Sequence, residues 1–164
     1  MMEPGSPEGE KSELTTIVLA DDHHVVRQGL RAVLEAESHF RVVGESGNGL
    51  EVARLVERLR PDVLVIDLMM PGLNGLEITR QVKKGSPKTH VIVLSMHRDE
   101  SYVVEALKNG AAGYVVKDSS VDELFKAIRE AIAGRRYLGP PCQTPPFLPT
   151  PDKAEPRRSI DITP

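Results

Sequence analysis

Five short apolar runs alternate with amphipathic segments along the middle of the chain. The runs are rich in Val and Ile and do not alternate strictly with polar residues, which is typical of strands that a sheet buries on both faces. We therefore expect strands at residues 15–20, 40–44, 63–66, 91–94 and 113–116.

The segments between and after these strands carry apolar residues at the spacing of a helix face. The pattern is clear in 26–34, 52–59 and 121–132, and weaker in 75–84 and 100–108. Strands that alternate with helices over short connections predict a parallel sheet with helices on both faces. Five such units favour a flavodoxin-like, doubly wound α/β fold with a five-stranded parallel sheet in the order 2-1-3-4-5.

Charge and proline content divide the chain into three parts. Its 164 residues are 40% hydrophobic and 27% charged, which suits one folded domain. The acidic residues of 1–13 account for the formal net charge of -3, and 139–164 holds eight of the 13 prolines. We expect a domain at 14–138 between two mostly disordered tails, 1–13 and 139–164.

Several locations and partners are disfavoured by composition. No apolar run approaches the roughly 18 residues that span a bilayer, and the acidic N-terminus lacks the apolar core of a secretory signal. The single cysteine, Cys142, cannot form an internal disulfide, so we expect a cytoplasmic protein without membrane contact. The pI of about 6.0 lacks the basic excess of a nucleic-acid-binding chain.

Polar side chains follow four of the five expected strands. Asp21 and Asp22 follow the first, Asp67 the third, Ser95 the fourth and Lys117 the fifth. Because parallel strands end at one edge of the sheet, these side chains should lie together. Clustered carboxylates favour a hard divalent ion such as Mg²⁺, and a carboxylate can also act as the nucleophile that forms an aspartyl phosphate. A lysine and a hydroxyl could then neutralise the oxygens of the phosphoryl group.

Each of these residues alone has a structural explanation. Asp22 could be the N-cap of the first helix, Asp67 a loop cap, Ser95 a turn hydroxyl and Lys117 a surface charge. Only their convergence from different strand ends favours a site. The adjacent histidines at 23 and 24 do not share a helix face, so we expect them to be solvated rather than metal ligands.

Short motifs around these residues resemble the receiver domain of bacterial response regulators. They are Asp21-Asp22-His23, the segment 67–72 (DLMMPG), Leu94-Ser95 and the segment 110–117 (GAAGYVVK). The resemblance runs from about residue 15 to residue 138. Val26-Arg27-Gln28-Gly29-Leu30, Val43-Gly44-Glu45 and the stretch 134–138 are most similar to the NarL/FixJ (LuxR-type) subfamily.

The resemblance implies a CheY-like fold and a phosphoacceptor. Asp67 would accept a phosphoryl group from a histidine kinase in a Mg²⁺-dependent reaction. Asp22 would bind Mg²⁺ directly, Asp21 directly or through water, and Asp67 and the backbone carbonyl of Met69 would complete the protein ligands. The protein would be a signalling phosphoacceptor, limited to self-phosphorylation and slow self-dephosphorylation, and not an enzyme with a separate substrate.

The resemblance also implies a conformational switch. Ser95 would turn toward the phosphoryl group, Tyr114 would follow it inward, and Lys117 would pair with the phosphoryl oxygens. The output would be altered association with a partner or with a second copy of the chain, and the first and fifth helices are the candidates for a homodimer.

Members of this subfamily control transcription through a C-terminal helix-turn-helix domain. Residues 139–164 are too few and too rich in proline for that domain, so we expect no specific DNA binding by this chain alone. The chain is then either a fragment of a transcription regulator or a single-domain regulator. The sequence of residues 139–164 does not distinguish between these two alternatives.

Three other functions are compatible with parts of the pattern. A phosphohydrolase that uses an aspartyl phosphate needs a second acid where Met69 stands. A nucleotide or flavin binder lacks its glycine-rich loop after the first strand. A receiver that acts only as a docking surface is disfavoured because all the site side chains are present.

Overall fold

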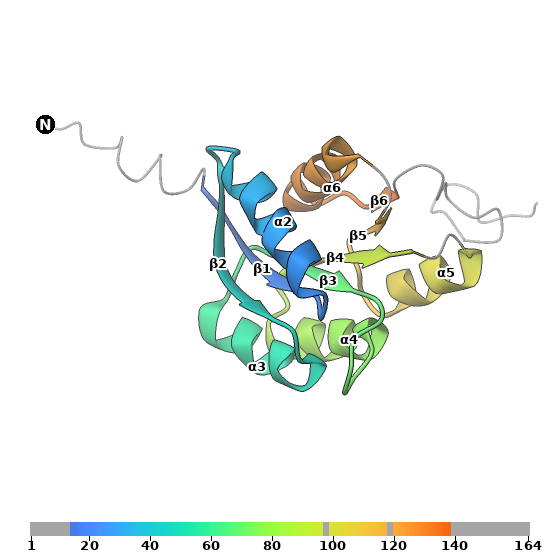
Figure 1. Ribbon diagram of the computed structural model, residues 1–164. Helices are drawn as coiled ribbons and strands as arrows, with labels where there is room; N and C mark the ends of the chain where they lie inside the picture. The colour runs from blue at the N-terminus through green and yellow to red at the C-terminus, as the bar shows by residue number, and fades with distance from the viewer. Residues whose placement is uncertain (1–13, 97–98, 118–119, 139–164) are drawn as a thin grey trace, which may run out of the picture.

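The computed structural model describes residues 14–96, 99–117 and 120–138 (Figure 1). The tails expected at 1–13 and 139–164 lie outside the described residues. The strands are β1 (Thr15–Ala20), β2 (Phe40–Ser46), β3 (Val63–Asp67), β4 (His90–Ser95), β5 (Gly113–Val116) and β6 (Tyr137–Leu138). The helices are α2 (His24–Glu35), α3 (Gly49–Leu59), α4 (Gly75–Gly85), α5 (Glu100–Lys108) and α6 (Val121–Ile132). Within the described part of the chain, no helix combines the length and the apolar character needed to cross a membrane.

The sheet is parallel throughout and has the order β2-β1-β3-β4-β5-β6. The expected order of the first five strands is confirmed, but the expected number of five is wrong. A sixth strand, β6, pairs with β5, and the backbone N–H of Tyr137 donates to the carbonyl of Ala112 at 2.9 Å. Two residues are too few to form an apolar pattern, so this strand depends on its pairing with β5.

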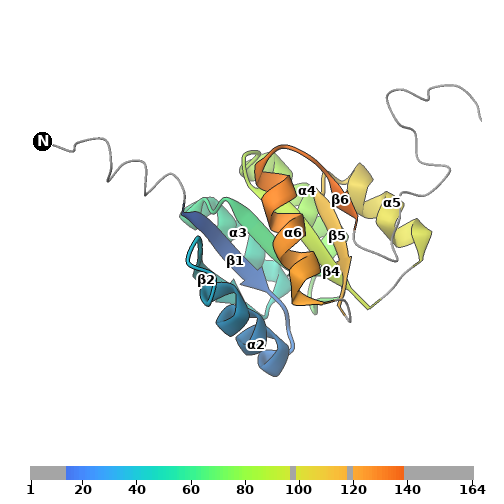
Figure 2. The same cartoon turned by 90° about the horizontal axis from the view of Figure 1, so that it is seen from above.

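Helices cover both faces of the sheet, as expected (Figures 1 and 2). Along β1, Val18 and Ala20 join the apolar cluster under α3, α4 and α5, whereas Ile17 and Leu19 join the cluster under α2 and α6. This is the two-residue alternation of a strand with both faces buried. All five residues of β3, at the centre of the sheet, are buried.

Two glycines allow the loop that follows β3 to pack closely against the starts of two helices. The backbone N–H of Gly75, the first residue of α4, donates to the carbonyl of Leu68 at 2.7 Å. A Cβ atom at Gly75 would lie 2.7 Å from the carbonyl oxygen of Asp67. At Gly49, the first residue of α3, a Cβ atom would lie 2.5 Å from the carbonyl oxygen of Leu73. The loop 68–74 therefore runs closely against the starts of two helices, which positions the end of β3.

The short strand β6 gives a pH-dependent contribution to stability. The Tyr137 hydroxyl donates to Glu123 on α6, and burial together with this carboxylate raises the pKa of Tyr137 to about 12. In the unfolded chain the phenol ionises near pH 10. The folded state is therefore favoured below pH 10, and this contribution is lost as the pH rises from 10 toward 12.

We expect Tyr137→Phe to flatten the pH dependence of stability in this alkaline range. A shift of this size is worth at most about 3 kcal/mol, and less here because Tyr137 is partly exposed. Urea unfolding of both proteins at several alkaline pH values would measure the difference. Equal slopes of unfolding free energy against pH in the two proteins would contradict the prediction.

Candidate functional site

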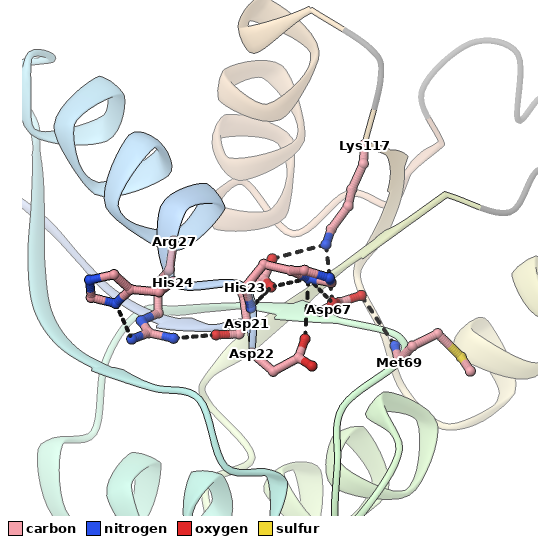
Figure 3. Close-up of polar contacts among 8 residues, drawn as sticks. All are labelled: Asp21, Asp22, His23, His24, Arg27, Asp67, Met69 and Lys117. Atoms are coloured by element: carbon pink, nitrogen blue, oxygen red, sulfur yellow. Dashed lines mark hydrogen bonds and ion pairs between the residues drawn. The ribbon is translucent and has the colours of Figure 1, made fainter.

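The side chains of Asp21, Asp67 and Lys117, which follow or end three of the strands, meet at one edge of the sheet (Figure 3). Asp21 follows β1, Asp67 ends β3, Ser95 ends β4 and Lys117 follows β5. Asp21, Asp67 and Ser95 are buried, with 1%, 4% and 1% of their surface exposed. The expected convergence at the carboxyl edge is therefore present in the structure.

Lys117 bridges two carboxylates. Its Nζ atom lies 3.0 Å from Asp67 Oδ2 and 3.0 Å from Asp21 Oδ2. Burial raises the pKa of Asp67, and the hydrogen bonds from Lys117 and from the backbone N–H of Met69 oppose that rise. Burial alone would lower the pKa of Lys117, but its contacts with Asp21 and Asp67 raise it overall. Lys117 is thus held as the cation that compensates buried negative charge.

The acidic cluster fits a divalent cation. Ligand atoms of Asp21, Asp22, His23 and Asp67 all lie within 4.8 Å of one another. Within residues 14–96, 99–117 and 120–138, Asp21 Oδ2 is a buried side-chain oxygen without a hydrogen-bond partner. It lies close to Lys117 Nζ but outside hydrogen-bond geometry. Lys117 therefore compensates the charge of this oxygen, and the fit to a divalent cation rests on the set of carboxylate oxygens, which are the ligands that Mg²⁺ prefers.

The loop after β3 fixes the orientation of Asp67. The backbone N–H of Met69 donates to Asp67 Oδ1 at 3.1 Å, while Oδ2 faces Lys117. The Met69 side chain points away from the cluster and the residue is 56% exposed (Figure 3). Only its backbone therefore belongs to the site.

The two residues expected to form the switch lie in different surroundings. Ser95 is buried at the end of β4, where its carbonyl accepts a 2.7 Å hydrogen bond from the backbone N–H of Lys117. Tyr114 has no exposed surface and packs into the apolar cluster under α3, α4 and α5. The tyrosine therefore already occupies an inward position in this structure.

His23 is the site residue that the sequence reasoning missed. Its Nδ1 atom lies 3.1 Å from Asp21 Oδ1, 3.2 Å from Asp22 Oδ1 and 3.8 Å from Asp67 Oδ2. The rest of the ring remains open to solvent, with 63% of the side chain exposed. The expected solvent exposure is confirmed for His23, but its Nδ1 atom also contacts the acidic cluster, whereas His24 points away from the cluster toward Arg27 (Figure 3).

The position of the helix start explains the miss. His23, not Asp22, is the N-cap of α2, and its backbone is extended rather than helical. Its own N–H donates to Asp21 Oδ1 at 2.8 Å, which turns the residue back toward β1. A rule about helix faces therefore does not apply to it. The start point of the helix was the missing information.

Arg27 supports the same loop from α2. Its guanidinium donates to the backbone carbonyl of Asp21 and, through Nε, to Glu45 Oε1 at 2.8 Å. A Cβ atom at residue 47 would lie 2.9 Å from Arg27 Nη1, so the glycine there leaves room for the guanidinium. Arg27 and Glu45 thus link the start of α2 to β2 and brace the acidic loop.

Comparisons with known proteins agree with this arrangement. The profile of the response regulator receiver domain matches residues 17–129. The chain is 41% identical over 124 residues to the transcriptional regulatory protein DegU of Brevibacillus brevis, covering 76% of this chain and 52% of that protein. It is 40% identical over 126 residues to the nitrate/nitrite response regulator protein NarL of Escherichia coli strain K12, covering 77% and 58%. The chain therefore spans a little over half the length of these curated relatives.

Solved structures show the same similarity. A LuxR-family two-component response regulator from Aurantimonas sp. SI85-9A1 superposes with a TM-score of 0.76 at 36% identity, covering 79% of this chain and 92% of that one. The signal receiver domain of the putative response regulator NarL from Mycobacterium tuberculosis gives a TM-score of 0.72 at 34% identity, covering 75% and 99%.

Proposed function

This chain belongs to the response regulator receiver domain family of two-component systems, and from that premise we propose that it accepts a phosphoryl group on Asp67 from a histidine kinase. The observation that carries the proposal is the place of Asp67 at the end of the central strand. Its Oδ2 lies 3.0 Å from Lys117 Nζ, and its carboxylate belongs to a cluster that fits a divalent cation.

In the proposed reaction, a carboxylate oxygen of Asp67 attacks phosphorus, and the P–N bond of the kinase phosphohistidine breaks. The electron pair of that bond stays with the imidazole, which takes up a proton. Asp21, Asp22, Asp67 and the Met69 carbonyl would hold Mg²⁺. This ion would neutralise negative charge on the phosphoryl oxygens. The Met69 N–H keeps the Asp67 carboxylate in a fixed orientation, and Lys117 is in place to meet the incoming negative charge.

Ser95 and Tyr114 are the proposed switch. A phosphoryl group adds about -1.5 to -2 charge at Asp67, and the Ser95 hydroxyl would donate to it. Since Tyr114 is already buried, phosphorylation would stabilise this inward position against an outward one. Reversing such an equilibrium from 1:99 to 99:1 takes roughly 5.5 kcal/mol of differential stabilisation.

The partners follow from the same proposal. We place the protein in the cytoplasm with its cognate histidine kinase, and we expect no specific DNA binding by residues 14–138 themselves. Self-association as a homodimer would use α2 and α6, which expose the apolar side chains Val25 and Ile132.

Phosphorylation by a small donor tests the proposal. We expect one phosphoryl adduct in the intact-mass spectrum after incubation with acetyl phosphate and Mg²⁺, and none with EDTA. Asp67→Asn should give no adduct under either condition, because the nucleophilic carboxylate is gone. An unmodified wild-type chain under all donor conditions would sink the mechanism and favour a receiver that acts only by docking to other proteins.

A further inference from the structure

We propose that His23 is a ligand of the bound metal through Nδ1, so that this site binds ions with affinity for imidazole, such as Ni²⁺, in addition to Mg²⁺. The inference rests on the proposed metal function of the acidic cluster and adds a nitrogen donor to it. Its basis is the position of one ring nitrogen among three carboxylates (Figure 3).

The spacing of the donor atoms suits a common ion. Adjacent ligands of an octahedral ion with bonds of about 2.1 Å lie about 3.0 Å apart. His23 Nδ1 lies 3.1 Å from Asp21 Oδ1 and 3.2 Å from Asp22 Oδ1. Its distance of 3.8 Å from Asp67 Oδ2 is longer than the spacing of adjacent octahedral ligands. The spacing therefore suits one ion between the imidazole, Asp21 and Asp22, and Asp67 would join them after a small shift.

The charge of these groups also points to a cation among them. Three carboxylates face one another, and Lys117 supplies a single positive charge against them. A divalent ion would balance the remaining charge of the cluster.

The imidazole changes which ion is preferred. Mg²⁺ takes oxygen ligands and gives up its waters reluctantly, so a ring nitrogen adds little to its binding. Ni²⁺ accepts octahedral geometry and binds imidazole well. The nitrogen of His23 should therefore raise the affinity for Ni²⁺ relative to Mg²⁺.

The adjacent histidine offers a matched control. His24 is the first residue of α2, directly after His23, but its Nδ1 lies 3.3 Å from Arg27 Nη2 and is directed away from the carboxylates (Figure 3). Replacing either histidine removes one imidazole from the exposed start of the same helix. Only His23→Ala removes a nitrogen from the cluster.

Calorimetric titration of the untagged chain with Ni²⁺ and, separately, with Mg²⁺ tests the inference. We expect His23→Ala to lower the ratio of Ni²⁺ to Mg²⁺ affinity by about tenfold or more. His24→Ala should leave this ratio within about twofold of wild type. In proton–nitrogen NMR spectra of the wild type, Ni²⁺ should broaden the ring signals of His23 before those of His24.

The outcomes separate this inference from the function on which it rests. An unchanged affinity ratio in His23→Ala, or an equal fall in both variants, would overturn the role of His23 as a ligand. If Mg²⁺ still binds and supports phosphorylation by acetyl phosphate in that case, the proposed function stands without it. If neither ion binds the wild-type chain, the metal site itself is refuted, and the inference with it.

Discussion

Lys117→Met is expected to lower the free energy of unfolding by about 3 kcal/mol in the presence of EDTA. The Lys117 side chain is only 12% exposed and lies 3.0 Å from carboxylate oxygens of both Asp21 and Asp67. Methionine keeps most of the side-chain volume but removes the charge. Two buried carboxylates are then left facing each other without a compensating cation.

Urea unfolding followed by circular dichroism measures the loss, and Mg²⁺ should restore part of it because a divalent ion replaces the missing positive charge. Lys83→Met is the matched control, since Lys83 Nζ donates to the carbonyls of Pro87 and Thr89 and not to carboxylates. Its stability should not respond to Mg²⁺ more than the wild type does. Adding Asp67→Asn to Lys117→Met should recover stability in EDTA. A Lys117→Met protein as stable as wild type in EDTA would refute this account.

Gly75→Ala is expected to lower the free energy of unfolding by about 3 kcal/mol, near the upper end of the cost of overpacking. The new Cβ atom would lie 2.7 Å from the carbonyl oxygen of Asp67 and 2.9 Å from Leu68 Cα. Both are backbone atoms, so no side chain can turn away to relieve the clash. The end of β3 must move, and phosphorylation of Asp67 by acetyl phosphate should slow as well.

Gly29→Ala provides the contrast for this prediction. Gly29 lies within α2, and a Cβ atom there would meet nothing within 4 Å. Alanine at an open position inside a helix should raise stability by about 0.5–1 kcal/mol. The two variants carry the same chemical change, so opposite signs in the unfolding free energy would support close backbone packing at Gly75. Equal effects would contradict it.

The sequence predicted those residues of the candidate site whose positions depend on the topology of the sheet alone. Asp21, Asp67, Ser95 and Lys117 each follow or end a buried strand, and parallel strands bring their carboxyl ends to one edge. No knowledge of side-chain packing was needed for that step. The order of the first five strands followed from the same repetition of strand and helix.

Other features depend on packing that the sequence pattern does not carry. The contact of His23 with the acidic cluster depends on α2 beginning one residue later than a cap at Asp22 would allow. The close approach at Gly75 depends on the path of loop 68–74, and β6 depends on pairing with β5. The pattern of apolar and polar residues does not determine any of these three contacts.

The strand order also affects how the chain folds during its synthesis. β1 pairs with both β2 and β3, so these three strands can assemble before β4 has been made. Until then β3 presents an unpaired, largely apolar edge of the kind that promotes association between chains. Synthesis of residues 68–89, which separate β3 from β4, takes roughly 1–4 s at about 5–20 residues per second. During that interval the strand that carries Asp67 is the one open to chaperones and to other nascent chains.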